Sequence, residues 1–265
     1  MNFLKNKTLI ITGASSGIGF ELSKQAIQKY NAKVIGVART TEKLQSTKEQ
    51  LGENFTYFSM DVSKETDWEN FAEYLKSNNI SADILINNAG IMLPFIKATD
   101  CDFNKLLKVI NIDLMSVLYS VKYIVPLLNK DKGLVNISSS ASLCPVVGQS
   151  AYSLAKSAVK SYTEVMQTEA DFYVGLILPG YCKTNIMRDI SISEKEKKYI
   201  DKVSISSEKC AKKILKSIDK KRQRKIIGLD AKFMNILYKL FPKKAGKIIA
   251  YFLRKSNFDI FKNIQ

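Results

Sequence analysis

A tyrosine and a lysine four residues apart, Tyr152 and Lys156, form the pattern Tyr-x-x-x-Lys. Residues with this spacing lie on the same face of a helix, one turn apart. An unperturbed tyrosine has a pKa of about 10 and is a poor acid–base catalyst at neutral pH. A neighbouring ammonium would stabilise the phenolate and lower the tyrosine pKa. The spacing therefore indicates a proton-transfer pair, although an exposed helix face can carry the same two residues.

Histidine is absent from the chain, which excludes Ser-His-Asp and Cys-His catalysis and imidazole metal ligands. The four cysteines are widely separated and form no Cys-x-x-Cys pair. They argue against a disulfide framework and a zinc site, and they fit a reducing compartment. The N-terminus lacks the apolar stretch of a signal peptide, and we find no apolar run of 18 or more residues. We therefore expect a cytoplasmic protein that uses no metal.

A glycine-rich segment, Thr-Gly-Ala-Ser-Ser-Gly-Ile-Gly at 12–19, follows a short apolar run and precedes a helical pattern. Glycines in such a turn allow the backbone to approach a pyrophosphate, and the helix N-terminus supplies free N–H groups. The strand–turn–helix context favours a dinucleotide site over an ordinary turn. The predicted contacts are Gly13, Ser15, Ser16, Gly17, Ile18 and Gly19.

The end of the second predicted strand indicates which dinucleotide binds there. An acidic residue at this point would bind the 2′-hydroxyl of NAD. The chain instead has Ala38 and Arg39, which leave room and a positive charge for a 2′-phosphate. We therefore favour NADP(H) over NAD(H), while noting that Arg39 could also be a surface arginine over the sheet edge.

Taken in order, these motifs resemble the single-domain branch of the short-chain dehydrogenase/reductase family. The resemblance covers about residues 5–188 and rests on TGASSGIG, Asn87-Asn-Ala-Gly90, Asn111, Ser139, Tyr152 with Lys156, and Pro179-Gly180. In that family Tyr152 would exchange a proton with the substrate oxygen, and Ser139 would hold the carbonyl oxygen. Lys156 would bind the nicotinamide ribose and lower the tyrosine pKa, and Asn111 would position a water for proton relay.

The same resemblance implies further cofactor contacts. Asp61 and Val62 would contact the adenine, and Thr184 would contact the nicotinamide carboxamide. Beyond the glycine-rich turn and Arg39, the resemblance implies cofactor contacts from Asp61, Val62, Asn88, Ala89, Gly90, Pro179, Gly180 and Thr184. It also implies that Tyr152 and Lys156 contact the cofactor. One departure from the family is a stretch at 166–174 that is a few residues shorter than usual.

The hydrophobic pattern predicts a doubly wound, three-layer Rossmann-type α/β fold with a parallel sheet. Strand-like runs at 8–12, 33–38, 56–61, 84–86, 134–138 and 173–178 alternate with helical patterns at 21–30, 41–51, 67–77, 104–128 and 152–168. We expect a domain over residues 1–228, with a substrate lid at about 185–203. A basic amphipathic helical extension follows at 229–265.

The net charge of +16 is concentrated near the C-terminus. Residues 1–189 hold 20 Lys and Arg against 18 Asp and Glu, whereas residues 190–265 hold 21 against 7. In the extension, Pro242 separates two apolar patterns interleaved with lysines. Such helices can lie on an anionic membrane surface, on the inner face in this case, or dock on the domain or a sister subunit. No recognition motif supports nucleic-acid binding.

We expect an NADP(H)-dependent enzyme that interconverts a carbonyl and a secondary alcohol on a small lipophilic substrate, as a dimer or tetramer. Two alternatives remain open at this stage. One is a reductase of 3-oxoacyl thioesters that uses the same site. The other is a non-catalytic protein at a membrane surface that senses NADP(H).

Overall fold

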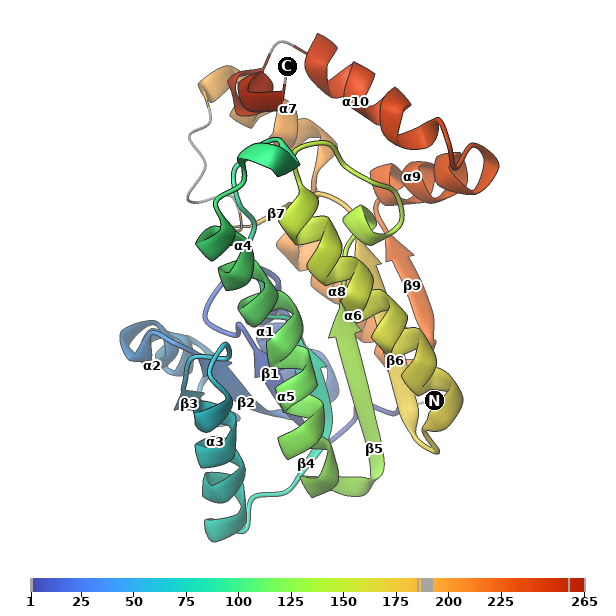
Figure 1. Cartoon of the computed structure of the whole chain (residues 1–265). Coiled ribbons are helices and arrows are strands. Elements are labelled where there is room, and N and C mark those ends of the chain that lie inside the picture. Colours follow the sequence, from blue (N-terminus) through green and yellow to red (C-terminus); the bar gives the residue numbers. More distant parts are fainter. Residues whose placement is uncertain (1, 185, 187–192, 257, 265) are drawn as a thin grey trace.

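A parallel seven-stranded sheet forms the centre of the molecule, in the order β3-β2-β1-β4-β5-β6-β9 (Figure 1). The structure is a computed structural model that describes residues 2–184, 186, 193–256 and 258–264. The strands are β1 (Thr8–Thr12), β2 (Lys33–Ala38), β3 (Phe55–Ser59), β4 (Ala82–Asn87), β5 (Leu128–Ile137), β6 (Tyr173–Pro179) and β9 (Arg224–Ile227). The predicted Rossmann-type α/β fold is confirmed.

Helices cover both faces of this sheet, giving three layers (Figure 1). The helices are α1 (Gly17–Tyr30), α2 (Thr41–Leu51), α3 (Glu65–Ser77), α4 (Phe103–Ile110), α5 (Ser116–Tyr123), α6 (Ser150–Glu169), α7 (Glu194–Val203), α8 (Ser207–Asp219), α9 (Leu229–Leu240) and α10 (Ala245–Lys255). Side chains of α1, α2 and α8 pack on one face, and those of α3, α5 and α6 pack on the other. Strands buried on both faces explain the continuous apolar runs in the sequence.

The helix predicted at 104–128 is divided in the structure. A π-helical turn, η2 (Asn111–Met115), separates α4 from α5, and a short 3₁₀ turn containing Pro126 ends the segment. β5 then begins at Leu128, six residues before the predicted strand at 134–138. The whole helical segment Phe103–Leu127 is long and apolar enough to cross a membrane by composition, with 44% of its most apolar window buried. Its packing against α3 and α6 accounts for part of that apolar character.

The C-terminal segment forms the two predicted helices, broken at Pro242 as expected, and then folds back over the domain. Its last turn, η6 (Asp259–Ile264), buries Phe261 against Phe95, with ring centroids 4.8 Å apart. The Ile260 N–H donates to Glu196 of α7 at 2.9 Å, which joins the end of the chain to the predicted lid region. Of the lid at 185–203, residues 185 and 187–192 lie outside the described residues.

The short stretch at 166–174 is accommodated without disturbing the sheet. α6 ends at Glu169 and β6 begins at Tyr173, so only residues 170–172 connect them. The amide of Gln167 donates to the carbonyls of Val174 and Gln223, which fastens the end of the helix to the edge of the sheet.

Phe71 should be one of the side chains on which α3 depends, because it is fully buried beneath the sheet beside Phe58. Replacing it by alanine is expected to cost about 3–5 kcal/mol of unfolding free energy through lost burial and a cavity. Urea denaturation followed by the fluorescence of Trp68, the single tryptophan, measures this directly. The exposed Lys76→Ala on the same helix is the control and should change stability by less than about 0.5 kcal/mol. Equal stability of the two variants would contradict the packing described.

Candidate active site

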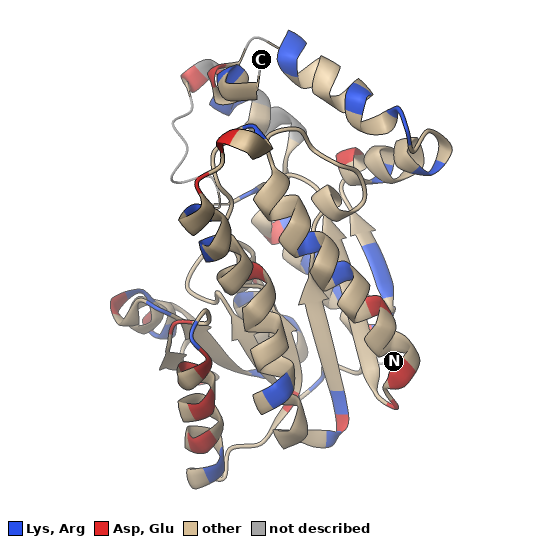
Figure 2. Cartoon of the chain, viewed as in Figure 1, with Lys and Arg blue, Asp and Glu red and all other residues tan. Residues whose placement is uncertain are grey.

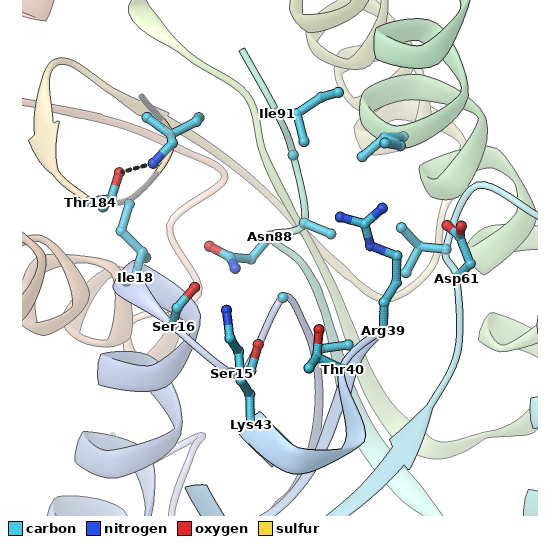
Figure 3. Close-up of a pocket in the computed structure, with 18 of the residues that line it drawn as sticks. Ser15, Ser16, Ile18, Arg39, Thr40, Lys43, Asp61, Asn88, Ile91 and Thr184 are labelled. Atoms are coloured by element: carbon cyan, nitrogen blue, oxygen red, sulfur yellow. Dashed lines mark hydrogen bonds between the residues drawn. The ribbon is translucent and has the colours of Figure 1, made fainter. Parts of the chain in front are cut away.

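A cleft opens at the carboxyl ends of the strands, where the strand order reverses between β1 and β4 (Figure 3). Open α/β sheets bind ligands at such a reversal. The cleft brings together most of the residues predicted for the dinucleotide. These are Gly13, Ser15, Ser16, Gly17, Ile18, Arg39, Asp61, Val62, Asn88, Ala89, Gly90 and Thr184.

The glycine-rich turn has the geometry that a pyrophosphate requires. Gly13 and Gly17 adopt φ of +70° and +54°, in the left-handed region that side chains disfavour. Gly19 packs so closely on the Gly13 carbonyl that a Cβ could not fit there. No side chain caps the start of α1, so its first N–H groups remain available to an anion. The turn therefore fits the phosphates of a dinucleotide.

Thr12 holds the turn after β1 against the turn after β4. Its buried hydroxyl oxygen accepts the backbone N–H groups of Asn88 and Ala89 at 2.9 and 3.0 Å. The Asn88 amide in turn donates to the Thr12 carbonyl at 2.8 Å. Asn88 thereby acts as a structural brace at the wall of the cleft, as well as lining it.

The far end of the cleft is cationic at β2. Arg39 and Lys43 both line it, with Thr40 between them, and the close-up shows both cationic side chains beside the cavity (Figure 3). Asp61 lies across from them after β3, where one of its oxygens accepts the Ser63 N–H and hydroxyl. Sequence reasoning missed Lys43, although its position in the first turn of α2 was readable from the predicted helix at 41–51.

Tyr152, Ser139 and Lys156 come together where β5 meets α6, as predicted. All three are buried, and the Lys156 Nζ lies 5.7 Å from the centre of the Tyr152 ring. Burial raises the pKa of Tyr152, and the charge of Lys156 and a hydrogen bond with Ser139 offset that rise only in part. In the protein alone the pKa of Tyr152 therefore lies above its usual value, not below it as the sequence led us to expect.

Asp113 adds to the effect of burial on the Tyr152 pKa, and sequence reasoning missed this residue. Its carboxylate is fully buried, pairs with the Lys156 Nζ at 3.0 Å and accepts the Ile91 N–H at 2.8 Å. Burial lowers the pKa of Lys156, but the negative charge of Asp113 outweighs burial and leaves that pKa above its usual value. The same negative charge opposes ionisation of Tyr152 and so helps to raise its pKa.

The role expected for Asn111, to position a water for proton relay, stays a prediction. Asn111 begins the π-helical turn η2, and the residue is exposed. Asp113 takes the inward position. The signal in the sequence was a carboxylate in the middle of an otherwise apolar helical stretch, which a buried cation would explain.

A second cavity adjoins Tyr152 and Ser139 on the side away from the adenosine end. Pro179, Gly180 and Thr184 line it, as the position of the nicotinamide end predicts. Apart from Lys156, its walls contain no lysine, arginine, aspartate or glutamate among the described residues. The remaining lining is largely apolar or neutral and includes Ile18, Met92, Val146, Gln149, Tyr181, Ile186 and Met234.

Met234 places the C-terminal extension in the wall of this cavity. It projects from α9, whose start is fixed to the floor of the cavity by Asp230. The Asp230 carboxylate accepts the Tyr181 N–H at 2.7 Å and lies so close to Gly180 and Gly228 that a Cβ on either would collide with it. The extension is therefore part of the site, which the sequence pattern did not indicate.

Comparison with known proteins gives a consistent result. Residues 7–195 match the family described as short chain dehydrogenase. A putative oxidoreductase SadH from Mycobacterium tuberculosis is 28% identical, over 94% of this chain and 96% of its own length. An 11-beta-hydroxysteroid dehydrogenase-like 2 protein from Arabidopsis thaliana is 30% identical, over 80% of this chain and 70% of its own length.

Solved structures show the same fold. A short chain dehydrogenase/reductase from Burkholderia phymatum, in complex with NAD, is similar with a TM-score of 0.80 and 19% identity. That similarity covers 92% of this chain and 96% of the other. A closed form of serine dehydrogenase complexed with NADP+ is similar with a TM-score of 0.72 and 24% identity, over 80% of this chain and 88% of the other.

Asp113→Asn should destabilise the protein by about 3–5 kcal/mol, because it leaves Lys156 as a buried charge without a partner. In that variant burial should depress the folded-state pKa of Lys156 below its unfolded value. Stability should then increase as pH rises toward about 10, where the unfolded lysine also loses its proton. Urea denaturation at several pH values measures both effects. The double variant Asp113→Asn/Lys156→Met is the control, since it removes the unpaired charge and should recover stability. A single variant as stable as the wild type would contradict the ion pair.

Proposed function

Because the chain belongs to the short-chain dehydrogenase/reductase family, we propose that it is an NADP(H)-dependent oxidoreductase that interconverts a carbonyl and a secondary alcohol on a lipophilic substrate. One observation carries the proposal. The buried cluster of Tyr152, Ser139 and Lys156 lines a largely apolar cavity that adjoins the cleft predicted to hold the dinucleotide. This arrangement suits an enzyme better than a protein that only senses the cofactor.

The choice of cofactor rests on the residues at the end of β2, because the similar structures hold NAD in one case and NADP+ in another. Arg39 and Lys43 offer two cations to a 2′-phosphate, and the position after β2 has no carboxylate. The turns after β1 and β4 would hold the pyrophosphate and the rest of the dinucleotide. When bound, the nicotinamide supplies or accepts the hydride.

Tyr152 and Ser139 would handle the substrate oxygen. In reduction, the phenol of Tyr152 donates a proton to that oxygen, and in oxidation the phenolate accepts one. The Ser139 hydroxyl would hold the oxygen by a hydrogen bond as its charge changes. Ser139 is kept in place because its oxygen also accepts the Ala141 N–H at 3.2 Å, at the start of a short 3₁₀ turn.

Lys156 would bind the nicotinamide ribose and supply positive charge beside Tyr152. Asp113 keeps that ammonium protonated and holds it beside Gly90, where an added Cβ would lie 2.8 Å from Asp113 and 3.1 Å from Lys156. We assign to Asp113 a supporting position beside Lys156 that the sequence did not indicate. Asp113 is a positioning residue in this scheme, since it would act through Lys156.

The substrate would be uncharged near its reacting carbonyl. Lys156 is the one charged group in the described lining of the second cavity, and Asp113 already neutralises it. A substrate carboxylate placed there would lose its hydration without gaining a partner. An apolar ketone or aldehyde fits these walls, and so does the acyl chain of a 3-oxoacyl thioester, which belongs in the same substrate panel.

Self-association is also part of the proposal. Four large apolar residues are exposed along α4 and α6, namely Phe103, Leu107, Leu154 and Val165. Helices that expose apolar side chains in this way commonly pack against a second subunit. We therefore propose a homo-oligomer built through α4 and α6.

Tyr152→Phe should lower the turnover of an apolar ketone by about 10²–10⁴-fold, because it removes the proton donor. NADPH binding should remain, since the phenyl ring preserves the packing. Tyr162→Phe, the same change on the same helix outside both cavities, is the control and should be fully active. In the wild type, alcohol oxidation should increase with pH up to the raised pKa of Tyr152, whereas ketone reduction should stay constant below that pKa and decrease only as pH rises through it. Full activity of Tyr152→Phe would refute the mechanism.

Arg39→Ala should weaken NADPH binding by about 10–100-fold, the effect of losing one charge-assisted phosphate contact. NADH binding should hardly change, because NADH has no 2′-phosphate. Lys33→Ala, at the opposite end of the same strand, is the matched control. Fluorescence titration with both nucleotides provides the measurement. Equal losses of NADPH and NADH affinity would remove Arg39 from the choice of cofactor.

A further inference from the structure

An apolar stripe runs along the outer side of α9. It consists of Leu229, Phe233, Ile236 and Leu240, each between 56% and 83% exposed. These residues follow the spacing i, i+4, i+7 and i+11, which places them on one face over three helical turns. The opposite face carries Ala231, which is buried, and Met234, which lines the substrate cavity. α9 is therefore apolar on both sides, and only the inner side is covered by the protein.

A cationic groove adjoins this stripe between α8, β9 and α9. Its cations are Lys213, Lys216, Arg222, Lys225 and Lys232, and no acidic residue lines it among the described residues. None of the five forms an ion pair with a carboxylate in the described part of the chain. Burial, together with the neighbouring cations, lowers the pKa of Lys225. The groove thus carries positive charge that no acidic side chain of the described residues balances.

The groove and the stripe are continuous with each other. Leu229 both lines the groove and begins the stripe, and Lys232 lies at the edge of each. Lys239 lies two turns further along the same edge of α9. Figure 2 shows Lys and Arg on β9 and along α10, which follows α9. On α10, Tyr251 and Phe252 are also exposed, next to Lys255.

We propose that the outer face of α9 and the adjoining cationic groove form a docking surface for an anionic lipid bilayer. The stripe would enter the boundary between headgroups and acyl chains, and the groove would bind anionic headgroups. Aromatic residues and lysines at the edge suit the headgroup level. Because Met234 lies on the other side of the same helix, docking would place the substrate cavity directly behind the lipid surface.

Charge favours the bilayer over other occupants. A two-fold contact between copies through α9 would bring two sets of uncompensated cations together. A nucleic acid would satisfy the cations and leave the apolar stripe in water. A partner that is anionic at its surface and apolar beneath satisfies both parts, and an anionic bilayer has this structure.

The test is co-sedimentation of the full-length protein with vesicles of phosphatidylcholine alone or mixed with phosphatidylglycerol. We expect pelleting with the anionic vesicles at low salt, and little with the neutral ones. Lys216→Gln/Lys232→Gln should weaken binding about 25-fold, or about five-fold for each lysine. Phe233→Ser/Ile236→Ser should abolish pelleting without destabilising the fold, since both side chains are exposed. Lys76→Gln/Lys130→Gln removes two exposed lysines on α3 and β5 and should bind normally.

Three results would overturn the proposal. One is the absence of pelleting with anionic vesicles, and another is an equal effect of the control and groove variants. The third is a concentration-dependent oligomer, seen by light scattering, that Phe233→Ser/Ile236→Ser dissolves while vesicle binding persists. NADPH binding measured on each variant confirms that it is folded. The assay uses neither turnover nor substrate, so its outcome is independent of the proposed reaction.

Discussion

Lys156 carries its charge at a depth where only 4% of the residue is exposed, and the surrounding structure is organised to keep that charge there. An unpaired buried ammonium costs several kcal/mol. Asp113 offsets this cost from η2, and the Ile137 carbonyl lies 3.4 Å from the Lys156 Nζ. Since Asp113 also accepts the Ile91 N–H, the same ion pair fixes the chain that follows Gly90. One interaction thus joins α6, the π-helical turn and the wall of the dinucleotide cleft.

A network of hydrogen bonds between uncharged side chains lies behind the site and also holds its elements together. The Asn87 amide donates to Ser120 and Asn136, and the Asn136 amide donates to Thr163, each within 2.9 Å. All four residues are buried, so each amide is satisfied by protein rather than water. Such a network tolerates little displacement between β4, β5, α5 and α6. The positions of Tyr152 and Lys156 are therefore set by the packing of whole elements.

The sequence predicted the features that depend on local pattern. The bounds of β1, β2 and α2 agree with it to the residue, because their apolar periodicity and flanking turns coincide. The glycine-rich turn, Ser139 and Tyr152 were found because their spacing is distinctive. Asp113 was missed because a continuous helical pattern does not show where a π-helical turn changes the face presented. The outward direction of the α9 stripe was not predictable either, since both sides of that helix are apolar and tertiary contacts choose between them.

Asp230 and Met234 join α9 to the substrate cavity, and this connection has a consequence for the kinetics of the reaction. The helix is fixed to the floor of the cavity at one end and forms the cavity wall further along, so it cannot move independently of the site. If the lipid surface lies on its other side, an apolar substrate would reach the cavity by lateral diffusion within the membrane. The relevant concentration would then be moles of substrate per mole of lipid. Adding empty vesicles at constant total substrate would dilute the substrate in two dimensions and slow the reaction, even though its concentration per unit volume is unchanged.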